Sequence, residues 1–350
     1  MHVAILTRQI GHYHDARYRG AAASFDRVTV ISLANEGEFK LFTATDLGEY
    51  AVERLFDGRD AYAAAVKSGA VQPAVEAVLD RVAPEVVAVA GWASAESFAA
   101  IRWARENGVP LVMMSESQGD DVARSPLREQ TKRIVAGGCD AGLVGGPPHR
   151  SYLAELGIPE DRIALGYNAV SNRHFAAGAA ASRDNAERLR AEHGLPARYI
   201  LASARFIEKK NLPRLVEAFA LARAALVADG LDGADLVILG DGDARPVVEA
   251  AIAAHAPTGS VHLPGFKGAD VLPVYYGLAE AFAHVSTVEQ WGLVVNEAMA
   301  AGLPVIVSDT NGVARTIGTD KCGWQVAPTD VSAIAAALEQ EMRLDGAARA

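Results

Sequence analysis

Residues 289–305 read EQWGLVVNEAMAAGLPV and are the most informative stretch of the sequence. An apolar run typical of a buried strand precedes them, and another follows directly. A helix is predicted from Gly292–Leu293 to Ala301, because Gly302 stands where a C-terminal cap is expected and Pro304 follows it. The stretch therefore predicts two parallel strands joined through a helix.

Short apolar runs rich in β-branched residues alternate with helix-like segments along the whole chain. These runs are continuous, which is typical of strands covered on both faces of a parallel sheet. The predicted strands are residues 3–6, 28–33, 86–90, 111–114, 141–144 and 163–165 in the first half, and 199–202, 236–239, 261–263, 281–285, 305–307 and 324–326 in the second.

The chain of 350 residues is long enough for two domains. A linker is predicted over residues 176–196, which begin with an Ala/Gly-rich run and end with a short polar helix stopped by Gly194. Residues 1–175 and 197–350 are each predicted to form a Rossmann-like, doubly wound parallel sheet of the α/β class. The two domains are expected to face a central cleft, which is the usual place for a ligand.

Composition excludes several classes of protein. The formal net charge is −10 and neither half of the chain is basic, so no nucleic-acid partner is expected. The two cysteines form no metal-ligand or disulfide pattern, and no apolar run approaches the ~18 residues of a membrane-spanning helix. The first residues become polar too soon for a signal peptide. These features predict a protein of the reducing cytoplasm.

One basic cluster has two interpretations. Arg124, Arg128, Lys132 and Arg133 lie close together in the sequence. They form either a solvated helix face or a patch that contacts anionic lipid. Peripheral contact with the inner face of the membrane is therefore one expectation from the sequence.

The start of the predicted helix suits an anionic ligand. The first backbone N–H groups, those of Leu293 and Val294, have no partner within the helix, and with the helix dipole they form a natural diphosphate site. Gly292 allows a ligand to approach the backbone closely. Glu289 in the preceding loop and Glu297 inside the helix need hydrogen-bond donors, and sugar or ribose hydroxyls are suitable. The alternative is an ordinary strand–loop–helix with two surface glutamates.

Further candidate residues follow predicted strands of the second half, where ligands of open α/β sheets bind. Arg205 and Lys210 lie five residues apart and suit a diphosphate, whereas Lys209 is the control residue that can face water. Gly240 lies in a Gly-Asp-Gly turn, and Gly265–Phe266 can bring backbone groups up to a flat base. Each of these segments alone is also explained as a simple surface turn.

In this order and spacing, the segments resemble the retaining glycosyltransferases of family 4, which have the GT-B fold. Glu289 and Glu297 match the E-x7-E motif of that family, and Arg205 and Lys210 match its basic pair. The resemblance implies that residues 197–350 bind a nucleotide-diphosphate sugar of the UDP or GDP type. The N-terminal domain resembles the acceptor-side domain more loosely, which implies a glycan or lipid-linked acceptor.

The resemblance also implies roles for these residues. Arg205 and Lys210 would neutralise the diphosphate, Glu297 would bind the ribose and Glu289 the hydroxyls of the donor sugar. The Gly265–Phe266 turn would contact the base. Neither a metal nor another cofactor is implied, because cations and the helix N-terminus stabilise the leaving diphosphate. The implied activity is sugar transfer with retention of configuration, in the synthesis of cell-surface polysaccharide.

The sequence departs from the family pattern at three places. Glu116 stands where the family often has a histidine, and a glutamate can position a hydroxyl or accept its proton. The glycine-rich loop after the first strand is only partly present, and Gly11, His12 and His14 are its candidates for contact with the acceptor. The last segment, 339–350, is shorter than the helix that usually crosses back to the first domain.

Two alternatives use the same donor site. A GT-B sugar-nucleotide epimerase would need acid–base groups over the sugar ring, and only Glu116 and the histidines are candidates for these. A non-catalytic subunit that binds nucleotide sugars would need the donor site alone. Replacement of Glu289 separates the classes, because a catalyst loses turnover whereas a binding protein loses only affinity.

Overall fold

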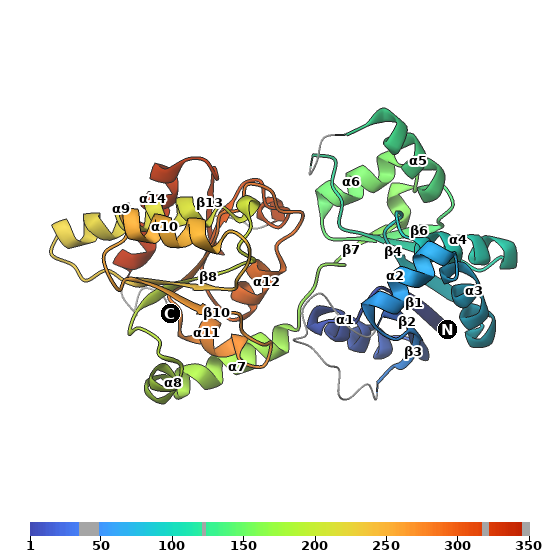
Figure 1. Ribbon diagram of the computed structural model, residues 1–350, viewed down its shortest axis with the longest axis horizontal. Helices are drawn as coiled ribbons and strands as arrows, with labels where there is room; N and C mark the ends of the chain where they lie inside the picture. The colour runs from blue at the N-terminus through green and yellow to red at the C-terminus, as the bar shows by residue number, and fades with distance from the viewer. Residues whose placement is uncertain (35–48, 121–123, 317–321, 345–350) are drawn as a thin grey trace. The chain divides into compact units, whose positions relative to one another are not determined.

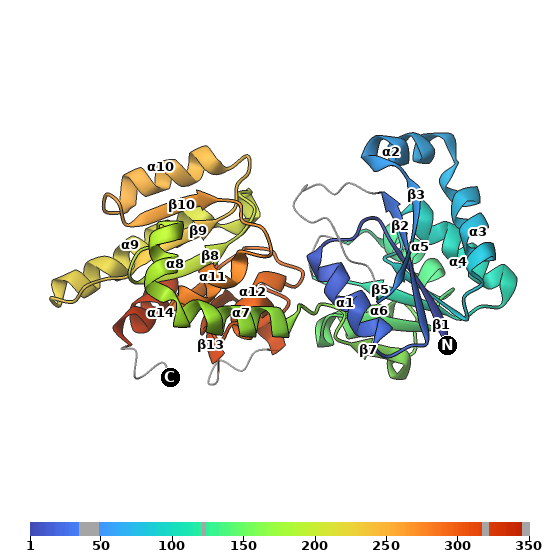
Figure 2. The same cartoon turned by 90° about the horizontal axis from the view of Figure 1, so that it is seen from below.

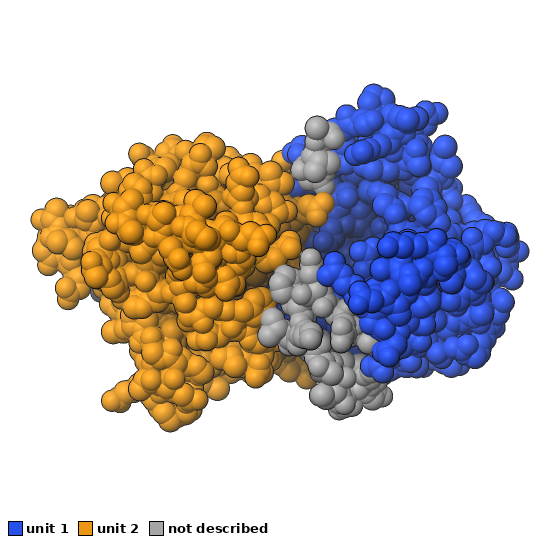
Figure 3. Space-filling view, in the orientation of Figure 1, with its two compact units in different colours: residues 1–170 blue, residues 171–350 orange. Residues whose placement is uncertain are grey.

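The computed structural model describes residues 1–34, 49–120, 124–316 and 322–344 (Figure 1). The chain divides into two compact units, Met1–Val170 and Ser171–Ala350 (Figure 3). Each unit is a parallel α/β sheet covered by helices, as the continuous apolar runs of the sequence predict.

The N-terminal unit contains a seven-stranded sheet in the order β3-β2-β1-β4-β5-β6-β7, and all of its strand pairs are parallel. Its strands are β1 (His2–Thr7), β2 (Arg27–Ala34), β3 (Ala51–Phe56), β4 (Val86–Ala90), β5 (Leu111–Ser115), β6 (Ala141–Val144) and β7 (Ile163–Leu165). Its helices are α1 (His12–Ala22), α2 (Gly58–Ser68), α3 (Val71–Val82), α4 (Ala95–Asn107), α5 (Pro126–Ala136) and α6 (Pro147–Glu155).

Side chains on the two faces of this sheet belong to different cores. Ala4 and Leu6 of β1 pack in a cluster with side chains of α3 and α4, whereas Val3 and Ile5 pack with Tyr18 of α1. Alternate residues of one strand are therefore buried on opposite faces, which explains why the run has no polar alternation. Figure 2 shows α3 and α4 together and α1 apart from them.

The C-terminal unit contains a six-stranded sheet in the order β10-β9-β8-β11-β12-β13. Its strands are β8 (Tyr199–Ser203), β9 (Asp235–Leu239), β10 (Val261–Gly265), β11 (Ala281–His284), β12 (Val305–Ser308) and β13 (Gly323–Val326). Its helices are α7 (Asn172–Asp184), α8 (Ala186–His193), α9 (Leu212–Ala228), α10 (Arg245–His255), α11 (Leu272–Leu278), α12 (Leu293–Ala300) and α14 (Val331–Arg343). Helices α9, α10 and α14 cover one face, and α7, α11 and α12 the other (Figure 1).

Every strand predicted from the sequence is present, within one or two residues at each end. The sequence prediction omitted β3, which is an error. Glu53 and Arg54 interrupt its apolar run, and all of its residues are at least partly exposed. This exposure is possible because β3 is an edge strand that pairs only with β2.

Helix α7 occupies much of the segment predicted as a linker, 176–196. Its Ala/Gly-rich composition reflects close packing against α11. A Cβ atom added at Gly178 would lie 2.5 Å from Pro273, and one added at Gly277 would lie 2.8 Å from Ala179. The polar helix α8 follows and ends at Gly194, which has a left-handed conformation as expected for a C-cap.

No helix among the described residues is both long and apolar enough to span a membrane.

Candidate functional site

The predicted strand–loop–helix of residues 281–301 is present as β11 and α12. Gly292 is the N-cap of α12 and has a φ of +99°, a conformation that favours glycine. A Cβ atom added there would also lie 2.7 Å from Nδ2 of Asn311. Gly292 is therefore needed for tight packing between this loop and the loop after β12. The predicted close approach of a ligand to its backbone stays a prediction.

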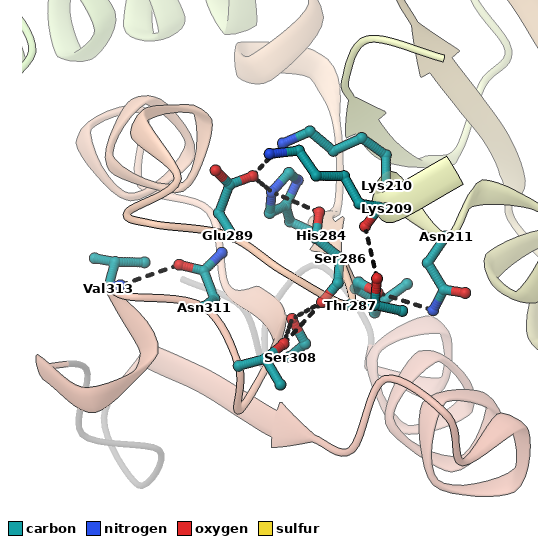
Figure 4. Close-up of polar contacts among 12 residues, drawn as sticks. Lys209, Lys210, Asn211, His284, Ser286, Thr287, Glu289, Ser308, Asn311 and Val313 are labelled. Carbon is teal, nitrogen blue, oxygen red and sulfur yellow. Dashed lines mark hydrogen bonds and ion pairs between the residues drawn. The ribbon is translucent and has the colours of Figure 1, made fainter. Parts of the chain in front are cut away.

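Three residues from separate elements meet in this loop (Figure 4). The Lys210 ammonium, from a short 3₁₀ turn after β8 (Glu208–Lys210), forms an ion pair with Oε2 of Glu289. Nε2 of His284, the last residue of β11, lies 3.0 Å from the same oxygen. All three side chains are largely buried, with exposed fractions of 12% for Lys210, 14% for Glu289 and 3% for His284.

This cluster keeps Glu289 ionised. Burial alone would raise the pKa of its carboxyl group, but the hydrogen bond from His284 and the charge of Lys210 outweigh burial and hold the pKa at about 2. Burial lowers the pKa of His284, which favours a neutral ring. Because a carboxylate only accepts hydrogen bonds, Nε2 of His284 carries the donated proton.

Backbone and side-chain hydrogen bonds fix the loops around the cluster. Asn211 caps α9 and is 5% exposed, and its Nδ2 donates to the carbonyl oxygens of Val285, at 2.9 Å, and Pro328, at 2.7 Å. The hydroxyl of Ser308 donates to the Ser286 carbonyl at 2.6 Å. The 3₁₀ turn and the loops after β11 and β12 are thus held as one assembly.

Glu289 itself is positioned through its backbone. Residues Glu289 and Asn311 form an isolated parallel bridge, and the Gly312 N–H donates to the Glu289 carbonyl at 3.0 Å. Asn311 is fully buried; its Oδ1 accepts from the Val313 N–H at 3.0 Å, and its Nδ2 has no partner among the described residues. The loop after β12 therefore contributes to the site, a feature that the sequence did not indicate.

Arg205 and Lys210, which are predicted to bind the same diphosphate, lie in different environments. Its side chain is exposed and makes no hydrogen bond or ion pair with the described residues. It lies two residues after the end of β8, at the carboxyl edge of the sheet, as predicted. The neighbouring Lys209 is also exposed, and its carbonyl oxygen accepts from the Thr287 N–H at 2.9 Å and from the Thr287 hydroxyl at 3.3 Å.

The two turns after β9 and β10 differ in their packing. Gly240 has a φ of +116°, and a Cβ atom there would overlap the Ala204 carbonyl oxygen. Gly240 is therefore required for the close approach of two strand ends. Gly265 has a φ of +80°, but a Cβ atom added to it would meet no described atom within 4 Å, and Phe266 after it is 48% exposed. Their predicted contact with a base stays a prediction.

Glu297 lies on the inner side of α12 and is 1% exposed. Its carboxylate accepts a 2.6 Å hydrogen bond from the buried hydroxyl of Tyr276 on α11. This contact gives Glu297 a part in joining two helices, which the sequence prediction did not include. Leu293 and Val294, at the start of α12, are only partly buried.

The acceptor-side candidates lie at the carboxyl edge of the N-terminal sheet. Gly11 caps α1, and its N–H donates to Nδ1 of His14 at 3.2 Å. The pKa of His14 is lowered to about 4, mainly by burial and to a smaller extent by the charges of Arg17 and His12. His12 lies against Tyr13, with ring centroids 3.8 Å apart. Glu116 directly follows β5 and is partly buried.

The basic cluster on and before α5 is divided between two environments. The Lys132 ammonium donates to Glu129 at 2.8 Å and to the Tyr152 hydroxyl at 2.9 Å, while the Arg124 guanidinium lies 4.4 Å from the centre of the Tyr152 ring. Arg128 and Arg133 are exposed. The four residues thus do not form one continuous basic patch.

Among the described residues, no group of three or more His, Cys, Asp or Glu side chains is arranged to hold a metal ion.

Comparisons with known proteins relate the C-terminal half to one family. The family model described as "Glycosyl transferases group 1" matches residues 185–349. An alpha-D-kanosaminyltransferase from Streptomyces kanamyceticus is 33% identical over 153 residues, which cover 43% of this chain and 38% of that protein. An alpha-monoglucosyldiacylglycerol synthase from Acholeplasma laidlawii is 35% identical over 105 residues, covering 30% of this chain and 25% of that protein.

A third relative, the putative colanic acid biosynthesis glycosyltransferase WcaL of Salmonella typhimurium, is 27% identical over 199 residues. The match covers 55% of this chain and 45% of that protein. The chain therefore spans less than half the length of each of these three relatives.

Solved structures extend the likeness to both units. HepE of Anabaena in complex with UDP superposes with a TM-score of 0.73 at 17% identity, covering 97% of this chain and 89% of that one. A sucrose-phosphate synthase from Thermosynechococcus elongatus gives 0.72 at 20% identity, with the same coverage. The predicted GT-B class of two Rossmann-like domains is thereby confirmed, and the C-terminal half is similar in sequence to group 1 glycosyltransferases.

Proposed function

We propose that this protein is a glycosyltransferase that moves a sugar from a nucleotide-diphosphate sugar to a hydroxyl group of a glycan or glycolipid. One observation carries the proposal. Lys210, Glu289 and the start of α12 converge at the carboxyl edge of the sheet in the half that matches group 1 glycosyltransferases. Arg205 follows β8 at the same edge. This edge is where open α/β sheets bind their ligands.

The proposed mechanism is electrostatic. Arg205 and Lys210 offset the charge of the diphosphate, and the first N–H groups of α12 are directed at it. Charge grows on the diphosphate as the bond to the sugar breaks, so fixed cations there stabilise the transition state more than the ground state. The same cations would allow reaction without a metal. Transfer with retention and membership of family 4 also belong to the proposal, on the E-x7-E spacing of Glu289 and Glu297.

The donor is proposed to be of the UDP or GDP type. The structures of HepE include complexes with UDP and with UDP-glucose, and their fold is similar to this one. Gly265 and Phe266 are the proposed contacts to the base, because the Gly265 turn is open and the Phe266 ring is 48% exposed. Glu289 is proposed to accept hydrogen bonds from the sugar, and Glu297 from the ribose.

The acceptor is proposed to contact the N-terminal unit, where Glu116 would position its hydroxyl or accept its proton. Gly11, His12 and His14 lie in the loop and helix start after β1, another carboxyl end of the same sheet. A polysaccharide-related acceptor is proposed because WcaL is named for colanic acid biosynthesis.

Peripheral membrane contact is proposed through α5. Leu127 and Ile134 are 74% and 73% exposed, seven residues apart on one side of the helix. Exposed Arg128 and Arg133 flank this apolar side. Such a pattern is typical of helices that lie at an anionic lipid surface. A lipid-linked acceptor at the cytoplasmic face would fit this placement.

Turnover with a panel of UDP-, GDP- and ADP-sugars in the presence of EDTA tests the activity. Nucleotide release that depends on an added acceptor, and that is lost in Glu289→Ala while nucleotide binding persists, is expected. Formation of an epimeric sugar nucleotide without nucleotide release would indicate the epimerase instead. Binding without any turnover would indicate a non-catalytic subunit.

A further inference from the structure

Two residues proposed to contact different parts of the donor are bound to each other. Lys210, proposed for the diphosphate, forms an ion pair with Glu289, proposed for the sugar hydroxyls. With exposed fractions of 12% and 14%, both side chains are shielded from water, so each strongly favours a charged partner. A diphosphate that binds Lys210 would therefore compete with Glu289 for the ammonium group.

The two partners of Glu289 differ in freedom. Lys210 has a long flexible stem and is the last residue of a short 3₁₀ turn. His284 belongs to β11 and is 3% exposed, and its ring stacks on Phe282 with an interplanar angle of 11°. One partner can therefore turn away from Glu289, whereas the other is held in the sheet.

We propose that a nucleoside diphosphate draws Lys210 away from Glu289, and that His284 then holds the released carboxylate in place to accept hydrogen bonds from the donor sugar. This inference rests on the proposed function. Lys210 would be the exchanging residue, and His284 would be a positioning residue that acts through Glu289.

The charges around the cluster favour this exchange. A diphosphate carries more negative charge than one carboxylate, and exposed Arg205 has no competing partner among the described residues, so it can attract the ligand first. Lys210 and His284 are the titratable groups that face Glu289, and the loop after β12 presents uncharged Asn311. Among the described residues, the hydrogen bond from His284 is thus the remaining side-chain contact that holds the Glu289 carboxylate after Lys210 leaves.

The proposed exchange is tested by whether loss of the Glu289 charge strengthens or weakens nucleotide binding. Glu289→Gln removes the charge that competes for Lys210 and keeps the size of the side chain. UDP, GDP and ADP are titrated calorimetrically into both proteins. We expect the nucleotide that binds the wild type to bind Glu289→Gln at least about threefold more tightly, because loss of the carboxylate leaves the shielded Lys210 charge without this partner. Unchanged or weaker binding in the variant would overturn the exchange, because a pair that persists in the complex supplies no competition.

The role of His284 is tested by the ratio of affinities for the sugar nucleotide and its parent nucleotide. Lys210→Gln should weaken both ligands and preserve the ratio, because His284 still positions Glu289. His284→Phe should reduce the ratio to that of Glu289→Gln, and His284→Gln, which retains an N–H donor, should restore it. A ratio that is the same in wild type and His284→Phe, with both proteins folded by thermal melting, would contradict the role.

These outcomes are distinct from failure of the proposed function. If no nucleotide or sugar nucleotide binds the wild type, the proposed function fails together with this inference. If the wild type binds and turns over a donor while Glu289→Gln shows no gain in nucleotide affinity, only the exchange fails. If His284→Phe does not fold, the comparison of wild type, Glu289→Gln and Lys210→Gln still decides the exchange.

Discussion

Arg205 and Lys210 carry the same charge but lie in different environments. Arg205 is exposed and unpaired among the described residues, whereas Lys210 is largely buried against Glu289. A ligand phosphate can therefore pair with Arg205 without displacing a protein group. The guanidinium also offers two parallel donors to a phosphate, which an ammonium does not.

Arg205→Ala is expected to weaken binding of a nucleoside diphosphate by about 1.5–3 kcal/mol, the value of a charge-assisted hydrogen bond. Binding of the parent nucleoside should change little, since it has no phosphate. Calorimetric titration of both ligands measures the difference. Lys209→Ala is the matched control, because that side chain is also exposed. Equal losses for nucleotide and nucleoside would rule out a diphosphate contact.

The acid dependence of stability should report the environment of Glu289. Its folded pKa of about 2 lies below the ordinary 4.5, so its ionisation stabilises the fold above about pH 4.5. The corresponding free energy is on the order of 3 kcal/mol and is lost as the pH falls from 4.5 towards 2.

Urea denaturation of the wild type and Glu289→Gln between pH 7 and pH 3 checks this prediction. The wild type should be the more stable protein at pH 7, and the difference should shrink as the pH falls. A difference that stays constant over this range would show that the Glu289 carboxylate is not held in its charged form by Lys210 and His284.

At the scale of elements, two glycines that both lie at strand ends, Gly240 and Gly265, differ in how closely other atoms pack against them. Gly240→Ala should destabilise the protein by about 2–5 kcal/mol, because the added methyl group meets a backbone carbonyl oxygen and φ is +116°. The methyl group of Gly265→Ala meets no described atom within 4 Å beyond its chain neighbours, so this variant should cost only about 1 kcal/mol through its positive φ. Thermal or urea denaturation ranks the two; similar losses would contradict the packing argument.

Gly265→Ala is also the more informative variant for function. If the turn approaches a base, the added methyl group should weaken nucleoside binding although the protein stays folded. An affinity equal to that of the wild type would remove the Gly265 turn from the site.

Helix α5 provides a second prediction at this scale. The double variant Leu127→Gln, Ile134→Gln should reduce binding to vesicles that contain phosphatidylglycerol by roughly tenfold, because two apolar side chains no longer enter the interface. Sedimentation with the vesicles measures it. Leu221→Gln, Val227→Gln on α9 is the control, since those residues are 51% and 61% exposed. Equal binding of both variants and the wild type would contradict the proposed membrane contact.

Elements with continuous apolar runs were predictable from sequence, and β8 illustrates why. Four of its residues, 199–202, are apolar and at most 1% exposed, so the run itself carries the signal. Strand β3 lacks that signal, because Glu53 and Arg54 are tolerated at a sheet edge. Helix α7 was also obscured, because its small residues serve packing against α11 and resemble a linker.

The candidate site was only partly predictable for a similar reason. Glu289 and Lys210 were recognisable from type and spacing, but their pairing depends on the tertiary fold that brings residues 79 positions apart together. His284 gave no signal beyond one polar residue near the end of an apolar run. The contact of Tyr276 with Glu297 likewise joins two helices that no local pattern connects.

At the scale of the whole molecule, the two units are related to known proteins in different ways, one by sequence and the other by fold. The family model covers residues 185–349, which lie in the C-terminal unit, whereas the N-terminal unit is related to known structures through its fold. The C-terminal unit is therefore the part in which the proposed chemistry can be argued from residues. The N-terminal unit has a similar framework, and under the proposed function its loops would determine which acceptor is used.

The central claim is that the C-terminal unit binds a nucleotide-diphosphate sugar through Arg205 and the cluster around Glu289. A thermal-shift screen of the full chain with UDP, GDP, ADP and their sugar conjugates, without added metal, tests it most directly. The account predicts that one nucleotide class raises the melting temperature, that Arg205→Ala diminishes the shift and that Lys209→Ala preserves it. No shift with any ligand, or an undiminished shift in Arg205→Ala, would contradict the account.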